Sequence, residues 1–283
     1  MARLNGAIGA LQSGKAAFAT FCAAGRGTAQ SLAGSAYDAV VFEMEHGGYD
    51  IGALRDSLQY LLDRRQIASS GSIVPAVTPL VRIPPNGGEM NQWIAKQVLD
   101  AGVYGIIWPH VSSVDEARNA VASCRYPRPQ QALRFEPAGQ RGDAPAAAAR
   151  YWGLTQQEYY AKADVWPLDP DGEILVGIMC EDVAGLRNLR AILREVPGIG
   201  VVIIGEGDLS QELGVPRQYD HPSVVAAMDE ILGICREAGV ACGHPHVDTA
   251  NVARVVGQGF RWLMPAPVRS FTALDEGRRL VGR

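Results

Sequence analysis

The sequence has no run of 18 apolar residues, so it contains no candidate for a membrane-spanning helix. Its first 15 residues lack the basic start and the apolar stretch of a secretory signal, and a cytoplasmic protein is therefore expected. An excess of positive charge is also missing, because the net charge is −4. Nucleic acids and anionic membranes attract basic surfaces, so small-molecule chemistry is the better expectation.

Cysteine is scarce as well. The five cysteines are odd in number and form no C-x-x-C pair, which argues against a disulfide framework and against a zinc ribbon. We interpret them as free structural thiols, because cysteine is among the most often buried residue types.

Short apolar or β-branched runs alternate with helical stretches, a pattern typical of repeated βα units around a parallel sheet. The predicted strands are Phe18–Cys22, Ala39–Phe42, Leu80–Ile83, Gly105–Trp108, Ile174–Met179, Val201–Ile204, Val240–Gly243 and Trp262–Met264. Predicted helices include Ile51–Leu62, Glu89–Leu99, Asp115–Val121, Val183–Leu193 and Phe271–Val281. Eight βα units in 283 residues, 47% of them hydrophobic, favour one closed (β/α)₈ TIM barrel of the α/β class over an open sheet.

The stretch from 126 to 172 breaks this rhythm before the fifth predicted strand. It contains six prolines and is too long for an ordinary βα loop, so we predict an insertion with short helices of its own within a single domain, 1–283. Trp152, Tyr159, Tyr160 and Trp166 give the insertion apolar surface to bury. A lid, a subunit contact and a passive extension are the alternatives.

The active sites of TIM barrels lie at the C-terminal ends of the strands, where the βα loops gather. The reactive side chains near or just after the ends of the predicted strands are Glu43, Glu45, His46, Arg82, His110, Glu181, Asp208, His244 and His246. They are expected to converge on one face of the barrel. The three lysines, Lys15, Lys96 and Lys162, lie away from this face, so a Schiff-base mechanism is not expected.

Glu181 and Asp208 follow adjacent predicted strands. Two carboxylates completed by water suit a hard divalent cation such as Mg²⁺ or Mn²⁺. The alternative is local capping, because Glu181-Asp182 opens a predicted helix and Asp208 lies in a Gly-x-Gly-Asp turn. Asp182 is the better capping residue of the first pair, which leaves Glu181 free to face the strand ends.

Four further residues are candidates for the site. His46, on a glycine-flanked loop, can exchange a proton near neutral pH, or it is an exposed or hydrogen-bonded loop histidine. Arg82 is a cation on an apolar strand, and its anionic partner is either a structural carboxylate or a substrate carboxylate. His244 and His246 have an i, i+2 spacing that can serve a zinc ion, although no third ligand is specified.

Several segments together resemble the HpcH/HpaI family of class II, metal-dependent 2-oxo-acid (pyruvate) aldolases. They are Asp38–His46 (DAVVFEMEH), Val81–Pro84 (VRIP), Leu99–Gly102 (LDAG), Ile178–Glu181 (IMCE) and Ile204–Ser210 (IGEGDLS). The resemblance runs through most of the chain. It implies a TIM barrel that binds Mg²⁺, Mn²⁺ or Co²⁺ through Glu181 and Asp208. Such a lyase cleaves or forms a carbon–carbon bond between pyruvate, or a related 2-oxo acid, and an aldehyde.

The resemblance also implies roles for other residues. Arg82 would stabilise developing negative charge, and His46 would be the acid/base, paired with Asp100. The backbone N–H groups of Gly207 and Asp208 would hold the pyruvate carboxylate. Because relatives assemble as hexamers, a homohexamer is expected.

Two positions depart from the family pattern. This chain has Glu43 where many members have Asp, and it has Met179, at the substrate-binding position, where many have Gln. Loss of that amide removes a hydrogen bond to substrate. An oxaloacetate-type decarboxylase, a CoA-ester lyase and a non-catalytic barrel that binds a 2-oxo acid therefore remain as alternatives.

Overall fold

The computed structural model describes residues 3–84, 90, 92–265 and 272–283. The strands are β1 (Ala17–Ala23), β2 (Ala39–Glu43), β3 (Thr78–Arg82), β4 (Gly105–Trp108), β5 (Val165–Trp166), β6 (Ile174–Cys180), β7 (Val201–Ile204), β8 (Ala241–Val247) and β9 (Trp262–Pro265). The helices are α1 (Gly6–Gln12), α2 (Arg26–Leu32), α3 (Ile51–Leu61), α4 (Arg64–Ser70), α5 (Gln92–Ala101), α6 (Val114–Ser123), α7 (Ala146–Trp152), α8 (Gln156–Lys162), α9 (Val183–Glu195), α10 (Glu206–Glu212), α11 (Pro222–Ala238), α12 (Val252–Gln258) and α13 (Thr272–Leu280).

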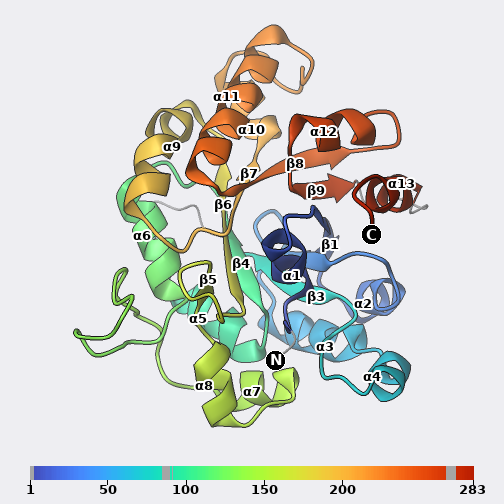
Figure 1. Cartoon of the computed structure of the whole chain (residues 1–283), viewed down its shortest axis with the longest axis vertical. Helices are drawn as coiled ribbons and strands as arrows, with labels where there is room; N and C mark the ends of the chain where they lie inside the picture. The colour runs from blue at the N-terminus through green and yellow to red at the C-terminus, as the bar shows by residue number, and fades with distance from the viewer. Residues whose placement is uncertain (1–2, 85–89, 91, 266–271) are drawn as a thin grey trace.

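Eight of these strands form a closed parallel barrel, which confirms the predicted fold. The order is β4-β3-β2-β1-β9-β8-β7-β6, and a parallel pairing of β4 with β6 closes the ring. The two-residue β5 adds to the start of β6. The helices surround the strands (Figure 1). All eight predicted strands are present, most with ends displaced by one or two residues.

The predicted helices are found as well, within the described part of the chain. The segment expected as Glu89–Leu99 is helical from Gln92 to Ala101, and its first residue lies outside the described residues. Phe271, the first residue of the expected C-terminal helix, also lies outside the described residues, and the rest of that helix corresponds to α13. No helix in the described ranges is long and apolar enough to cross a membrane.

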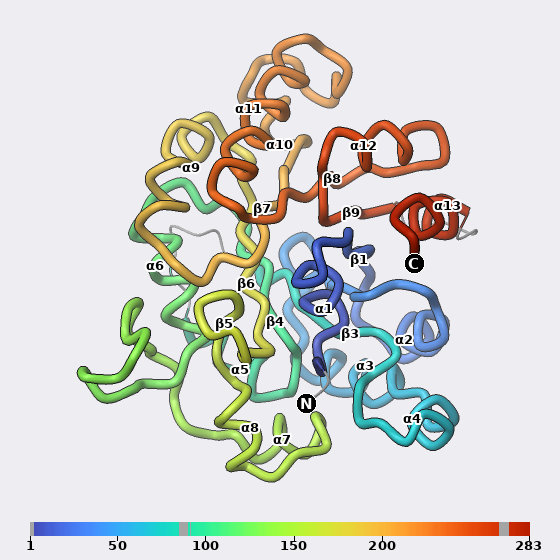
Figure 2. Tube along the Cα trace, in the orientation of Figure 1, coloured from blue at the N-terminus to red at the C-terminus, as the bar shows by residue number. Residues whose placement is uncertain are grey.

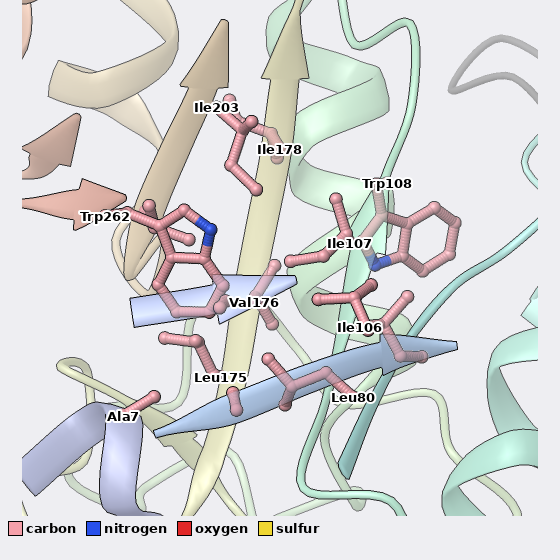
Figure 3. Packing of buried hydrophobic residues seen from close by; sticks show 14 of the residues in the cluster. Ala7, Leu80, Ile106, Ile107, Trp108, Leu175, Val176, Ile178, Ile203 and Trp262 are labelled. Carbon is pink, nitrogen blue, oxygen red and sulfur yellow. The ribbon is translucent and has the colours of Figure 1, made fainter. Parts of the chain in front are cut away.

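Most residues of the barrel strands are apolar, because one face packs inside the ring and the other faces the helices. Every residue of β3, β4, β6, β7 and β9 is buried. Figure 3 shows large side chains from these strands, and the inward-facing ones include Leu80, Ile107 and Trp262. The barrel is therefore a packed core, and chemistry is confined to its ends.

Helix α1 covers the N-terminal end of the barrel. The amide of Asn5, its N-cap, donates hydrogen bonds to the carbonyls of Tyr104 and Glu173, which precede β4 and β6. The backbone N–H of Gly6 donates to the hydroxyl of Thr78 at the start of β3. In Figure 2 the α1 trace lies over the middle of the ring of strands. Access to the interior is thus left to the C-terminal face of the barrel.

The predicted insertion contains two short helices, α7 and α8, as expected. Trp152 of α7 stacks on Tyr104 with ring centroids 4.1 Å apart, and its indole N–H donates to the carbonyl of Gly102 at 2.8 Å. Tyr159 of α8 packs edge-on against the same Trp152. These contacts place both helices beside the N-terminal end of β4. A role of the insertion as a lid or a subunit contact stays a prediction.

Candidate active site

The loop after β2 is shaped by the carboxylate of Glu43. Its Oε1 accepts the backbone N–H groups of Glu45 at 2.7 Å and of His46 at 3.0 Å. A carboxylate that accepts two N–H bonds fixes the turn that carries the next two reactive side chains. The departure from Asp to Glu at this position therefore keeps an acceptor in place.

Arg82, the last residue of β3, is the cation of the site. Register pairs it with Glu43, and its Nε donates to Glu43 Oε2 at 2.6 Å. Its Nη1 lies 2.8 Å from Glu45 Oε2, and its guanidinium lies over the ring of Phe21 at 4.4 Å from the centroid. Within this chain the partners of Arg82 are thus two carboxylates, and its role toward a substrate carboxylate stays a prediction. Its planar fork spans both of them.

Glu181 and His110 meet because β4 and β6 are neighbours in the closed ring. Trp108 is in register with Ile178, so the residues that follow each strand leave the barrel at one level. The backbone N–H of His110 donates to Glu181 Oε1 at 2.5 Å, and the ring Nδ1 lies 3.6 Å from the same oxygen. The ring Nε2 lies 3.6 Å from Glu45 Oε1.

Gly205, directly after β7, makes room for the Glu181 side chain. A Cβ at this position would lie 3.0 Å from Cδ of Glu181 and would overlap its Cβ and Oε2. Glycine is therefore the residue that allows a carboxylate from β6 to lie against the end of β7.

Negative charge dominates this part of the barrel. Burial raises the pKa of Glu181 to about 7, and the charges of Glu45 and Asp208 add to that rise. Burial likewise raises the pKa of Glu45, against the opposing effect of Arg82. Oε2 of Glu45 is buried and, although it lies close to Arg82, it makes no hydrogen bond. Carboxylates in excess of cations suit a divalent cation.

The predicted residues on α10 lie beside this cluster. Asp208 is exposed in the first turn of the helix, near enough for its charge to act on Glu181. The cluster of mutually close ligand atoms in the described part of the chain is Glu45, His110 and Glu181, and Asp208 is not in it. Gly207 faces open space, and the N-cap, Gly205, leaves the first turn without a side-chain cap. Met179 lies inside the barrel with its sulfur 3.6 Å from Arg82 Nη1.

His46 and Asp100, the predicted acid/base pair, have other neighbours within this chain. The His46 side chain is 68% exposed, and its Nε2 lies 3.6 Å from Oε2 of Glu45. Asp100, near the end of α5, binds Arg141, whose Nη2 donates to its carboxylate at 2.9 Å. The carboxylate that the chain itself places next to His46 is thus Glu45. A pairing of His46 with Asp100 stays a prediction.

His244 and His246 of β8 lie outside the carboxylate cluster. Burial lowers the pKa of His244 to about 4. His246 pairs with Glu206, whose hydrogen bond raises the pKa of the imidazole, and stacks on Tyr219. Neither belongs to a group of three mutually close ligand atoms among the described residues. The cysteines are free, as interpreted, and four of the five are buried.

From the sequence, Glu45 and His110 are expected at the C-terminal face, but no pattern gives either of them a role in the site. The signal was present in their positions directly after β2 and β4. The residues that contact them in space could not be derived, because the insertion separates β4 from β6 in the sequence and no local pattern indicates that these strands pair. The left-handed backbone of His110, with φ of 50°, is likewise not encoded in a local motif.

Comparison with known proteins finds relatives over most of the chain. A family model described as HpcH/HpaI aldolase/citrate lyase matches residues 22–264. A hydroxypyruvate/pyruvate aldolase of Paraburkholderia phytofirmans is 30% identical over 83% of this chain and 80% of its own. A 2-keto-3-deoxy-L-rhamnonate aldolase of Klebsiella pneumoniae is 34% identical over 82% of this chain and 74% of its own.

Solved structures of similar fold come from members of the same family. A HpcH/HpaI aldolase/citrate lyase family protein from Burkholderia cenocepacia superposes with a TM-score of 0.73 at 25% identity, covering 95% of this chain and 94% of the other. A HpcH/HpaI aldolase from Desulfitobacterium hafniense has the same TM-score at 22% identity, covering 98% of this chain and 96% of the other. The predicted family is confirmed: this chain belongs to the HpcH/HpaI aldolase/citrate lyase family.

Proposed function

We propose that this chain is a divalent-metal-dependent aldolase that makes or breaks a carbon–carbon bond between pyruvate, or a related 2-oxo acid, and an aldehyde. The observation that carries the proposal is the buried carboxylate Glu181, held at the C-terminal face beside Glu45 with too little positive charge to neutralise both. The named relatives are aldolases, and the family gives the reaction class of a carbon–carbon lyase.

Glu181 and Asp208 are proposed as the carboxylates that hold the metal. Glu181 is 2% exposed and fixed by the backbone N–H of His110, while Asp208 is exposed on the adjoining helix and lies close enough to influence the pKa of Glu181. A bound Mg²⁺, Mn²⁺ or Co²⁺ supplies Lewis-acid polarisation of the 2-oxo group, which makes the adjoining carbon acidic. The backbone N–H groups of Gly207 and Asp208 would receive the substrate carboxylate.

Arg82 and His46 are proposed as the groups that act on the substrate. Arg82 keeps its guanidinium rigid between Glu43 and Glu45, so it can stabilise developing negative charge without reorganising. His46 is exposed at the entrance, within 3.6 Å of Glu45, and would move the proton of the substrate hydroxyl or methyl group. Met179 occupies the place of an amide and offers the substrate only a weak sulfur acceptor.

Product analysis with pyruvate and a panel of aldehydes, with added Mn²⁺ or with EDTA, tests the function. Condensation that requires metal supports the proposal, whereas release of CO₂ from oxaloacetate without any aldehyde product would favour a decarboxylase. We expect Glu181→Gln and Asp208→Asn each to abolish turnover and to weaken Mn²⁺ binding in calorimetry. Glu195→Gln, on the exposed end of α9, is the matched control and should change neither.

The cytoplasmic location and the homohexamer expected from the resemblance are further parts of this proposal. Light scattering coupled to gel filtration measures the assembly directly. A monomer in solution would contradict the hexamer and leave the proposed reaction unaffected.

A further inference from the structure

His110 lies between two carboxylates, with one ring nitrogen toward each. Nδ1 faces Glu181 Oε1 and Nε2 faces Glu45 Oε1, both at 3.6 Å. The side chains of Glu181 and Glu45 are 1% and 6% exposed, and that of His110 is 28% exposed. One ligand atom from each of the three lies within 4.8 Å of the other two. Ligand atoms of one ion lie about 3 to 4 Å apart when the metal–ligand bonds have ordinary lengths, and the 3.6 Å between Nδ1 of His110 and Oε1 of Glu181 is within that range.

The backbone of His110 explains why the ring points this way. Its φ of 50° is in the left-handed region, which non-glycine residues rarely adopt. This conformation directs both the backbone N–H and the imidazole toward Glu181. Strained conformations of this kind persist where the surroundings fix them, and they are concentrated at functional sites.

The second carboxylate, that of Glu45, is placed to orient the imidazole of His110. A metal-bound histidine usually donates its other ring N–H to a carboxylate, which fixes the tautomer. Oε1 of Glu45 faces Nε2 of His110, and its other oxygen pairs with Arg82 at 2.8 Å, which fixes the carboxylate in place. Nδ1 is then the nitrogen with a free lone pair, and it faces Glu181.

We propose that Nδ1 of His110 is a nitrogen ligand of the metal at Glu181, with Glu45 orienting the imidazole, and that this ligand makes the site prefer Mn²⁺, Co²⁺ or Zn²⁺ to Mg²⁺. The inference rests on the proposed function, because it concerns the same metal. Its chemical basis is that imidazole suits transition metals, whereas Mg²⁺ takes oxygen ligands and keeps its water.

Pulsed electron paramagnetic resonance of the protein with bound Mn²⁺ detects a coordinated nitrogen without any turnover. We expect nitrogen coupling in the wild type and its loss in His110→Asn. Asparagine tolerates positive φ and keeps the backbone N–H that binds Glu181, so only the imidazole is removed. His46→Asn is the matched control, since His46 also lies 3.6 Å from Glu45, and it should retain the coupling.

Titrations with Co²⁺ and with Mg²⁺ give the second measurement. His110→Asn should weaken Co²⁺ binding at least about tenfold and change the Mg²⁺ dissociation constant by less than about threefold. Melting curves of the metal-free variants establish that both are folded.

Three results would overturn the inference. Coupling that survives in His110→Asn and disappears in His46→Asn assigns the ligand to His46. Mn²⁺ binding without nitrogen coupling in the wild type removes the imidazole ligand but leaves the metal-dependent aldolase intact. Absence of binding by every divalent ion tested removes the proposed function together with the inference.

Discussion

Replacement of Gly205 by alanine is a small change that should disable the metal site. The new Cβ would lie 3.0 Å from Cδ of Glu181 and would overlap its Cβ and Oε2. Carbon atoms in contact normally lie about 3.5 to 4.0 Å apart, so the Glu181 side chain or the end of β7 must move. Both positions are buried, which leaves the carboxylate no vacant space to enter.

The size of the effect follows from that overlap. Inserting one carbon into a packed interior costs about 1 to 3 kcal/mol, less than the total stability of a typical domain, so the barrel should still fold. A carboxylate displaced by about 1 Å no longer lies where the other metal ligands converge. We expect Mn²⁺ affinity to fall at least about a hundredfold, equivalent to about 2.7 kcal/mol of binding free energy.

Calorimetric titration with Mn²⁺ and a thermal melt measure the two quantities separately. The matched control is Gly233→Ala on α11, where an added Cβ meets nothing within 4 Å. That variant should bind Mn²⁺ normally and gain stability, because alanine favours the helix over glycine by about 1 kcal/mol. If Gly205→Ala bound Mn²⁺ with wild-type affinity, Glu181 would not be a ligand in the position described.

Two further predictions concern charge. Arg82→Lys keeps a cation but loses the fork that spans Glu43 and Glu45. It should lower the free energy of unfolding by about 2 kcal/mol, measured by denaturant unfolding, and turnover by at least about tenfold, measured by steady-state kinetics. Unchanged values for both would contradict the role given to the fork. His244 has its pKa lowered from 6.5 to about 4, so the stability from burying the neutral ring is full above pH 6.5 and is lost as pH falls toward 4. The loss should reach about 3 kcal/mol, and His244→Gln should remove this pH dependence from unfolding curves recorded between pH 7 and 4; an unaltered curve would place the acid sensitivity elsewhere.

The barrel could be predicted from the sequence because its determinants are local. Strands β4 and β7 begin and end where their apolar runs do, at Gly105–Trp108 and Val201–Ile204. A strand buried on both faces needs a continuous apolar run, and such a run can be recognised in the sequence without knowing which strands pair with it. Eight of them in a chain of this length then limit the topology to a closed ring.

The contacts within the site depend on long-range pairing and were not predictable in the same way. Arg82 faces Glu43 because β2 and β3 are in register, and His110 faces Glu181 because β4 pairs with β6 across the insertion. Asp100 is bound by Arg141 of the insertion, a partner 41 residues away that no local pattern indicates. The residue types at the strand ends could be predicted, but their mutual contacts required the closed barrel.

Exchange of the methyl hydrogens of pyruvate in D₂O, followed by proton NMR, tests the central claim most directly. With Mn²⁺ or Mg²⁺ present and no aldehyde, the protein should exchange these hydrogens, because polarisation of the 2-oxo group beside a general base is sufficient to labilise them. EDTA should stop the exchange, and His46→Ala should slow it at least about a hundredfold while Mn²⁺ binding stays normal. Full exchange by His46→Ala would move the base to another group, with Glu45 next to it. Absence of exchange by the wild type with Mg²⁺, Mn²⁺ and Co²⁺ would contradict the metal-dependent aldolase itself.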